Sequence, residues 1–222
     1  MINVAIDGPA GAGKSTIAKL VAKEKNYIYV DTGAMYRAIA LFLIRNSVDV
    51  SNEEMVSKAC DSINIDIKYN DGSQLVFLNN EDVSTEIRKE EVGNMASKAA
   101  AVSVVRDKLL QLQRDLAKTN NVIMDGRDIG TFVLPEAPLK IYLTASVDAR
   151  ANRRFNQLVE KGDSPDINKI KFDIEQRDYQ DMNRKIAPLK QAEDAVYLDS
   201  SDMTIEEVVE YIVNKINAIE NI

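Results

Sequence analysis

Residues 8–15 carry a glycine-rich spacing that is typical of nucleotide phosphate binding. They read Gly8-Pro9-Ala10-Gly11-Ala12-Gly13-Lys14-Ser15, which is the Gly-x-x-x-x-Gly-Lys-Ser pattern of a phosphate-binding loop, or P-loop. The glycines allow backbone N–H groups to converge on phosphate oxygens. The N-terminus of a following helix would add the positive end of its dipole. The pattern therefore predicts that the chain binds a nucleoside triphosphate.

Two side chains at the end of this loop have distinct expected roles. Lys14 is predicted to reach the β- and γ-phosphates, and Ser15 to offer its hydroxyl to Mg²⁺. The predicted ATP-binding set runs through residues 8–16 and consists of Gly8, Pro9, Ala10, Gly11, Ala12, Gly13, Lys14, Ser15 and Thr16.

The absence of histidine narrows the available chemistry. The chain has no His and a single cysteine, Cys60, so a His general base, an internal disulfide and a structural zinc site are not expected. Lysine, arginine, carboxylates, hydroxyls, the backbone and a hard cation remain. That inventory suits phosphoryl transfer, in which the protein mainly positions groups and neutralises charge.

The composition limits which binding partners and which cellular compartment are expected. The 222 residues include 28 basic and 35 acidic side chains, a net charge of −7, which argues against nucleic acid and anionic membrane as partners. The apolar run at residues 38–44 is too short to span a bilayer. An apolar strand follows Met1 at once and leaves no room for a signal peptide. We therefore expect a cytoplasmic protein.

Alternating apolar and amphipathic segments predict an α/β fold. Strands are expected at residues 3–7, 27–30, 122–124, 139–143 and 196–198, and helical patterns, beginning with residues 15–25, lie between most of them. Such alternation favours a parallel sheet with helices on both faces. Ligands bind beyond the carboxyl ends of these strands. The polar residues that follow, at positions 7–8, 31–33, 125–128 and 199–201, are therefore the candidates for a site.

One segment breaks the alternation. Residues 63–69 and 74–79 resemble two strands joined by a hairpin turn at 70–73, and residues 81–83 are predicted to add a short third strand. We interpret roughly 60–98 as a subdomain inserted into the core. A surface ornament without a role is the alternative.

The last third of the chain is helical and rich in arginine. Helical patterns at residues 146–161 and 166–186 are separated by a turn at 162–165, and a lid is predicted at roughly 148–166. Its charge could instead form a solvated helix face. The last helix is expected to begin at Thr204, because Thr204 and Glu207 have the spacing of a capping box.

Acceptor-site candidates follow the second and third predicted core strands. Thr32, Tyr36 and Arg37 leave one strand end and enter a helix. Arg37 and Arg127 are each suited to hold a phosphate with two hydrogen bonds. Arg127 lies between Asp125 and Asp128, which are its alternative partners in ion pairs.

Three nucleotide-dependent functions compete at this point. A GTP-dependent switch is disfavoured because the Asn-Lys pairs at 168–169 and 214–215 lack an aspartate two residues later. A motor or regulatory ATPase usually has paired acidic residues after a strand, whereas Asp125 stands alone after residues 122–124. A small-molecule kinase needs an acceptor site and a lid that excludes water, and the chain offers candidates for both.

Together these residues resemble the bacterial cytidylate kinase family, P-loop nucleoside monophosphate kinases that move a phosphoryl group from ATP to CMP or dCMP. The resemblance covers nearly the whole chain. The matching blocks are residues 7–16 (DGPAGAGKST), 31–37 (DTGAMYR), 83–88 (VSTEIR), 125–130 (DGRDIG) and 177–184 (RDYQDMNR), the last followed by APL at 187–189.

The resemblance implies roles for individual residues. The CMP-binding set would be Thr32, Tyr36, Arg37, Ser97, Arg106, Arg127, Asp128, Asp181 and Arg184, with Ser97 and Arg106 recognising cytosine and Asp181 binding the sugar hydroxyls. The catalytic set would be Lys14, Arg127, Arg150, Arg153, Arg154 and Arg177. Family members often have proline three residues before Arg106, where this chain has Ser103, a residue suited to a helix cap.

The resemblance also implies an architecture. It is one P-loop kinase domain over residues 1–222, an α/β fold with a five-stranded parallel sheet flanked by helices, an inserted monophosphate-binding subdomain and a helical lid. The expected ligands are ATP with Mg²⁺ and CMP or dCMP, and a monomer is expected. A kinase for another small acceptor and a nucleotide-binding regulator remain the alternatives.

Overall fold

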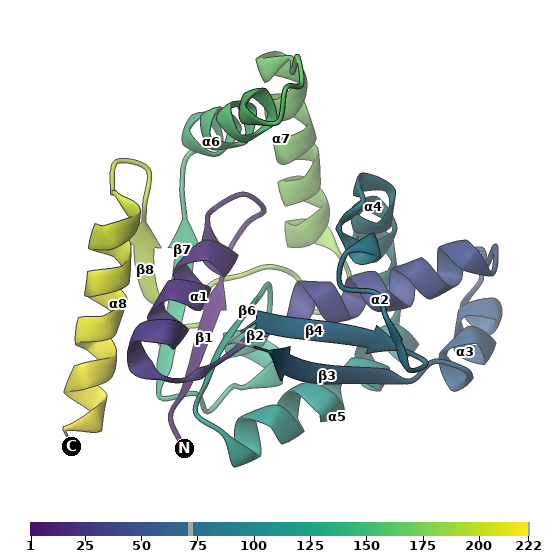
Figure 1. Cartoon of the computed structure of the whole chain (residues 1–222), viewed down its shortest axis with the longest axis horizontal. Helices are drawn as coiled ribbons and strands as arrows, with labels where there is room; N and C mark the ends of the chain where they lie inside the picture. The colour runs from purple at the N-terminus through teal and green to yellow at the C-terminus, as the bar shows by residue number, and fades with distance from the viewer. Residues whose placement is uncertain (71–72, 222) are drawn as a thin grey trace. The chain divides into compact units, whose positions relative to one another are not determined.

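Five strands form the central sheet in the order β2-β6-β1-β7-β8 (Figure 1). Their bounds are β1 Asn3–Asp7, β2 Ile28–Asp31, β6 Val122–Gly126, β7 Leu139–Thr144 and β8 Val196–Asp199. β7 pairs in parallel with both β1 and β8. Each strand lies within two residues of its predicted position, so the expected five-stranded parallel sheet is confirmed.

The computed structural model describes residues 1–70 and 73–221, and it divides into two compact units. The P-loop unit consists of Ile2–Tyr27 and Ile123–Ile222, and the insert unit consists of Met1 and Ile28–Val122. Within the described residues, no helix is long and apolar enough to cross a bilayer.

A close backbone approach explains the first glycine of the P-loop. β1 is buried from Val4 onward, and at its end Gly8 adopts φ 149°. A Cβ atom at Gly8 would lie 1.9 Å from the carbonyl oxygen of Leu143 on β7. Because no side chain fits there, only glycine lets the chain leave β1 beside β7 and turn into the loop.

The helix after the loop packs against the last helix of the chain. α1 (Lys14–Lys25) begins after Gly13, which has φ 90°, and lies beside α8 (Ile205–Glu220) in Figure 1. The far ends of the two helices are joined, because the Glu220 carboxylate accepts hydrogen bonds from Lys25 Nζ at 2.5 Å and from the Tyr27 hydroxyl at 2.6 Å.

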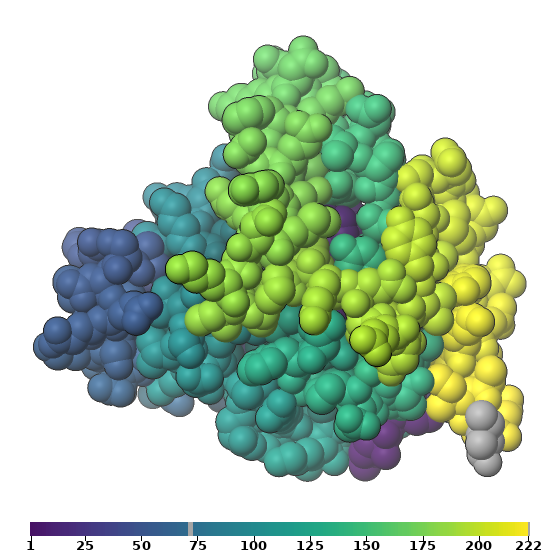
Figure 2. All heavy atoms as spheres, turned by 180° about the vertical axis from the view of Figure 1, so that it is seen from behind, coloured from purple at the N-terminus to yellow at the C-terminus, as the bar shows by residue number. Residues whose placement is uncertain are grey.

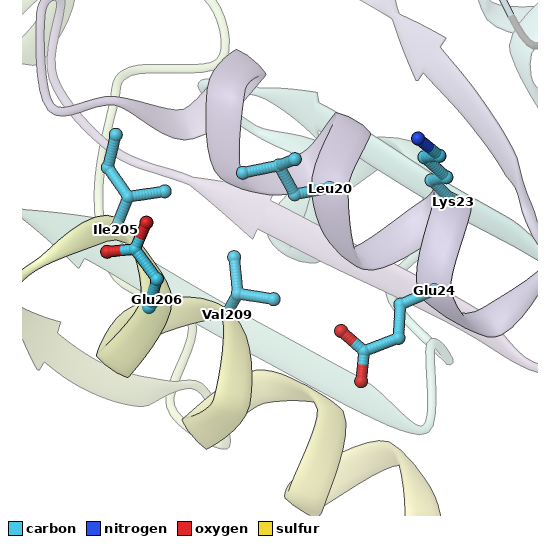
Figure 3. A pocket seen from close by; sticks show the side chains of 6 residues that line it. All are labelled: Leu20, Lys23, Glu24, Ile205, Glu206 and Val209. Atoms are coloured by element: carbon cyan, nitrogen blue, oxygen red, sulfur yellow. The ribbon is translucent and has the colours of Figure 1, made fainter.

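A shallow groove runs over the outer surface between these two helices. Figure 3 shows the side chains that line it, and they are Leu20, Lys23, Glu24, Ile205, Glu206 and Val209. None of them belongs to the predicted site.

The remaining helices of the P-loop unit form a hairpin. α6 (Val147–Glu160) and α7 (Ile167–Asn183) pack against each other at the top of Figure 1. Ser146 and Asp166 cap their N-termini through side-chain hydrogen bonds, as expected for polar residues at those positions. A π-helical turn, η2 (Ile129–Val133), follows β6.

The insert unit contains the predicted hairpin. β3 (Ile65–Asn70), β4 (Ser73–Leu78) and β5 (Glu81–Asp82) form a separate antiparallel sheet, so all three expected strands are confirmed. Asp71 and Gly72 of the predicted turn lie outside the described residues. The helices of this unit are α2 (Thr32–Arg45), α3 (Glu53–Asp61), η1 (Glu86–Arg88), α4 (Glu90–Ala99) and α5 (Ser103–Thr119).

The amide side chain of Gln74 connects the inserted sheet to the end of β2. Gln74 Oε1 accepts a hydrogen bond from the Asp31 backbone N–H at 2.8 Å, and Gln74 Nε2 donates to the Asp31 carbonyl at 3.2 Å. β4 also packs against α2. The start of α2, which carries the predicted acceptor residues, is thereby held by the insertion.

The predicted capping box of α8 is present and is open to a stability test. Thr204 Oγ1 accepts from the Glu207 N–H at 3.2 Å, and Glu207 Oε2 accepts from the Thr204 N–H at 2.8 Å. Thr204→Ala removes one of these bonds, so we expect the free energy of unfolding in urea to fall by about 1 kcal/mol. Thr204→Ser keeps the hydroxyl and is the control; an alanine variant as stable as the serine variant would contradict the capping role.

Candidate active site

The side chain of Lys14 turns back onto the P-loop and contacts its backbone. It is 5% exposed, and its Nζ donates hydrogen bonds to the carbonyl oxygens of Gly8 and Pro9, both at 2.7 Å. These contacts hold a buried ammonium at the start of α1, where the backbone dipole also favours negative ligands.

Charged side chains surround this ammonium. Burial and the neighbouring Arg127 guanidinium lower the pKa of Lys14 well below its usual range, while Asp125, Asp7 and Asp181 act in the opposite direction. Two cations, Lys14 and Arg127, and three carboxylates are thus clustered beside the loop, and the carboxylates favour the charged form of the buried lysine.

Ser15 and Asp125 provide oxygen ligands next to the loop. Ser15 Oγ donates to Asp125 Oδ2 at 2.9 Å, which joins the start of α1 to β6. Magnesium is usually held by one or two carboxylates together with substrate phosphates and water, so a hydroxyl and a carboxylate at this spacing fit the predicted ion. Among the described residues there is no cluster of three His, Cys, Asp or Glu side chains that could hold a metal without a substrate.

Arg127 forms its ion pair with a residue far along the chain. Its Nε donates to Asp181 Oδ2 on α7 at 2.8 Å. Burial alone would lower the pKa of Arg127, but the carboxylates of Asp181, Asp125 and Asp7 together outweigh it and the pKa is raised. Burial alone would raise the pKa of Asp181, but the guanidinium groups of Arg127, Arg177 and Arg184 together outweigh it and the pKa is lowered. The neighbours Asp125 and Asp128, predicted as alternative partners, are thus replaced in this ion pair by Asp181.

A second ion pair stands beside the first. Arg184 Nη2 lies 3.4 Å from Asp128 Oδ1, and both side chains are buried. Arg184 Nε also donates to the Ala187 carbonyl at 2.6 Å. Four predicted acceptor residues of the P-loop unit therefore form two ion pairs between positions far apart in the sequence. Arg127 pairs with Asp181, and Asp128 pairs with Arg184.

Asp7 links the P-loop strand to the segment after Arg127. Its carboxylate accepts from the backbone N–H groups of Ile129 at 2.8 Å and Gly130 at 2.7 Å. Burial raises the pKa of Asp7 to about 6, although these two hydrogen bonds oppose the shift. The sequence predicted Asp7 only as a polar residue at a strand end. In the structure its carboxylate holds the first residues of η2 in place.

The four predicted lid arginines differ in their surroundings. Arg150 is 4% exposed and forms an ion pair with Asp178 at 2.7 Å. Arg153 donates to the carbonyl and hydroxyl oxygens of Ser200. Arg154 is exposed and Arg177 half-buried. Arg150 is therefore paired with a carboxylate, whereas Arg154 on the same helix is open to solvent.

The first turn and a half of α2 holds three predicted acceptor residues in the insert unit. Asp31 caps this helix by accepting from the Ala34 N–H at 2.9 Å, and its other oxygen pairs with Arg88 at 3.1 Å. Thr32 is buried and Tyr36 half-buried. Arg37 Nη1 donates to the carbonyl of Ile87 at 3.0 Å, so its guanidinium lies at the inserted segment.

Arg106 lies close to Tyr36 in the same unit. Its guanidinium is 5.8 Å from the centre of the Tyr36 ring, within cation–π range, and it donates to the Ala100 carbonyl at 3.3 Å. Helix α5 begins at Ser103, and Val102 occupies the cap position. The prediction that Ser103 serves as the cap is therefore wrong, since Ser103 lies inside the first turn and donates to Asp107 at 3.3 Å. Ser97 is half-buried on α4.

A family comparison covers nearly the whole chain. The family model for cytidylate kinase matches residues 4–218. The chain belongs to the cytidylate kinase family. It is 53% identical over 209 residues to a cytidylate kinase from Caldicellulosiruptor saccharolyticus, with 94% of this chain and 92% of the relative covered.

A second curated relative and a solved structure were also found to be similar to this chain. A cytidylate kinase of Bacillus cereus is 46% identical over 218 residues, covering 98% of this chain and 97% of the relative. The structure of an uncharacterised protein from Eubacterium ventriosum covers 98% of this chain and 99% of its own, with a TM-score of 0.54 and 12% identity. At that identity it indicates a shared fold alone.

The raised pKa of Asp7 predicts how stability depends on pH. Because Asp7 takes up a proton more readily in the folded state than in the unfolded chain, its contribution is complete below pH 4 and is lost as the pH rises through 6. A shift of two pKa units corresponds to about 3 kcal/mol. We expect the stability of the wild type relative to Asp7→Asn, from urea unfolding, to fall by about that amount between pH 4 and pH 7.

Asp163→Asn removes an exposed carboxylate and is the matched control for this measurement. Its stability difference from the wild type should change little over the same pH range. A flat difference for Asp7→Asn would show that Asp7 titrates as an ordinary surface carboxylate.

Proposed function

We propose that the chain transfers the γ-phosphoryl group of ATP to CMP or dCMP, giving ADP with CDP or dCDP. The observation that carries this proposal is the family match over residues 4–218. The buried P-loop lysine and the ion pairs around it support the reaction type, because phosphoryl transfer depends on positioning and on neutralised charge.

On the donor side, we propose that Lys14 exchanges its two carbonyl partners for phosphate oxygens. The carbonyls of Gly8 and Pro9 hold Nζ at 2.7 Å, and the β- and γ-phosphates carry more negative charge than carbonyl oxygens do. The depressed pKa of Lys14 would rise in the presence of those phosphates. The N–H groups of residues 10–15 bind the same oxygens.

On the acceptor side, we propose that Arg37, Arg127 and Arg184 bind the phosphate of CMP. Thr32 and Tyr36 contact the nucleotide, Ser97, Arg106 and Asp128 recognise the base, and Asp181 binds the sugar hydroxyls. Each arginine has protein oxygen partners. An incoming phosphate therefore competes with oxygens that already orient the guanidinium groups.

The reaction needs no general base, which agrees with the lack of histidine. An oxygen of the CMP phosphate is ionised at neutral pH and attacks the γ-phosphorus in line. The new P–O bond forms as the bond from the γ-phosphorus to the bridging oxygen of ADP breaks. We propose that Lys14 and the arginines at 150, 153, 154 and 177 neutralise the charge of the transferred group.

We propose Mg²⁺ as the cation of this reaction, held by Ser15 together with Asp125, phosphate oxygens and water. When bound it would neutralise charge on the phosphates. We also propose a cytoplasmic monomer that acts on ATP and CMP or dCMP, with neither nucleic acid nor membrane as partner. The domain division we propose is one kinase domain with a monophosphate-binding insertion at roughly 60–98 and a lid at roughly 148–166.

The acceptor is tested by ATP turnover with a panel of monophosphates. We expect CMP and dCMP to be phosphorylated far faster than UMP or AMP, because the groups proposed to read the base are specific for cytosine. A coupled assay that detects ADP gives kcat/KM for each acceptor. Equal rates with UMP and CMP would reject the cytosine specificity, and ATP consumption with none of the acceptors would favour a nucleotide-binding regulator.

The role of Lys14 is tested by Lys14→Ala. Loss of one preorganised cation at a transferring group typically costs about 10²–10³ in rate, so we expect kcat with CMP to fall by that amount while circular dichroism remains unchanged. Lys23→Ala removes an exposed lysine from the same helix and should leave kcat within twofold. Turnover of Lys14→Ala within tenfold of the wild type would contradict the assigned role.

A further inference from the structure

The guanidinium of Arg150 joins three parts of the P-loop unit. Nε donates to the Ala145 carbonyl at 2.8 Å, Nη1 donates to the Ala10 carbonyl at 3.0 Å, and Nη2 pairs with Asp178 Oδ2 at 2.7 Å. Arg150 stands on α6 and Asp178 on α7, whereas Ala10 is in the P-loop. One buried side chain thus connects the base of the helical hairpin to the loop.

The stem of Arg150 also packs along the loop. A Cβ atom at Gly11 would lie 3.6 Å from Arg150 Cβ and 3.9 Å from its Cγ and Cδ, which are ordinary contact distances. In the rear view of Figure 2, purple atoms of the N-terminal segment are visible in a narrow opening beside the green α6–α7 hairpin. The Arg150 side chain therefore lies beside the loop at Gly11 and donates a hydrogen bond to it at Ala10.

The Ala10 carbonyl needs a partner for a physical reason. A P-loop turns successive N–H groups toward the phosphates, so some of its carbonyl groups must point away from them. The Ala10 carbonyl is partly buried, and a carbonyl that is shielded from water without a donor is costly. Arg150 supplies that donor through Nη1. The Asp178 carboxylate, which pairs with Nη2, orients the guanidinium for this contact.

Asp178 is suited to hold Arg150 in this orientation. Its side chain is 13% exposed, and that of Arg150 is 5% exposed, so little water screens the pair. Asp178 Oδ1 is buried and has no hydrogen-bond partner among the described residues. The contact that holds this carboxylate is therefore the one from its other oxygen, Oδ2, to Arg150.

We propose that Asp178 is a positioning residue for the donor nucleotide. It holds Arg150 against the Ala10 carbonyl, and this contact keeps the tip of the P-loop in the conformation that binds the triphosphate. The inference rests on the proposed function only in taking ATP as the donor. It assigns Arg150 a supporting task in addition to the charge neutralisation proposed above.

The test is the dissociation constant of MgATP, measured by calorimetry without any acceptor. For Asp178→Ala we expect binding about tenfold weaker, because the loop loses a preset geometry. Asp178→Asn keeps a neutral acceptor for Arg150 and should lie between the wild type and alanine. Asp173→Ala removes an exposed carboxylate from the same helix and should bind ATP within twofold of the wild type.

A double-mutant cycle with Arg150→Ala separates positioning from a direct effect. If Asp178 acts through Arg150, Asp178→Ala should weaken ATP binding no further in the Arg150→Ala background. Removing one partner of a buried pair is strongly destabilising. If Asp178→Ala does not fold, Asp178→Asn and the double variant, which lacks both charges, supply the comparison.

Steady-state kinetics give the readout that a merely structural role would not move. We expect KM for ATP to rise about tenfold for Asp178→Ala, with KM for CMP and kcat at saturating ATP within threefold. Unchanged ATP affinity, a loss confined to kcat or CMP, or additive effects in the cycle would overturn the proposal. A wild type that binds ATP but does not phosphorylate CMP would reject the proposed acceptor and leave the role of Asp178 standing.

Discussion

The need to keep several charges buried around Lys14 constrains most of the P-loop unit. Lys14, Asp7, Asp125 and Asp181 are each 5% exposed, and a buried charge is tolerated only when it has partners. The partners come from distant parts of the chain, so satisfying them requires β1, β6 and α7 to be placed correctly. A phosphate-binding site and the packing of its supporting elements are in this way the same requirement.

The proposed residues are distributed unequally between the two units. All of those proposed for ATP lie in the P-loop unit, whereas Ser97 and Arg106, two of the three residues proposed to read the base, lie in the insert unit. The choice of acceptor therefore depends in part on a stretch of sequence that the use of ATP does not involve. Changes in the inserted sheet or in α4 are expected to alter which monophosphate is used before they alter the use of ATP.

The local features were predictable because each has a short-range cause. The P-loop spacing, the strands, the inserted hairpin and the capping box at Thr204 follow from residue types a few positions apart. The ion-pair partner of Arg127 could not be predicted in this way. Asp125 and Asp128 are closer to Arg127 along the chain than Asp181, which is 54 residues away.

The role proposed for Asp178 could not be predicted from the sequence either, because its partner is also distant along the chain. Its partner Arg150 belongs to another helix, and their pairing becomes visible only when α6 and α7 pack. The position of Ser103 was also misjudged, because the helix begins one residue earlier than its polar side chain suggested. Pairings across elements depend on tertiary geometry, which residue spacing alone does not contain.

The joint formed by Glu220 has a consequence for the motions of the molecule. α1 begins with Lys14, the lysine proposed to bind phosphate, and ends at Lys25, which forms an ion pair with Glu220 in the last turn of α8. Fraying of the C-terminal helix would therefore release the far end of the helix that carries the loop. Segments that share such contacts tend to open as one cooperative unit. The amide protons of α1 and α8 should therefore exchange with solvent at similar rates. In this way the last helix stabilises the first one.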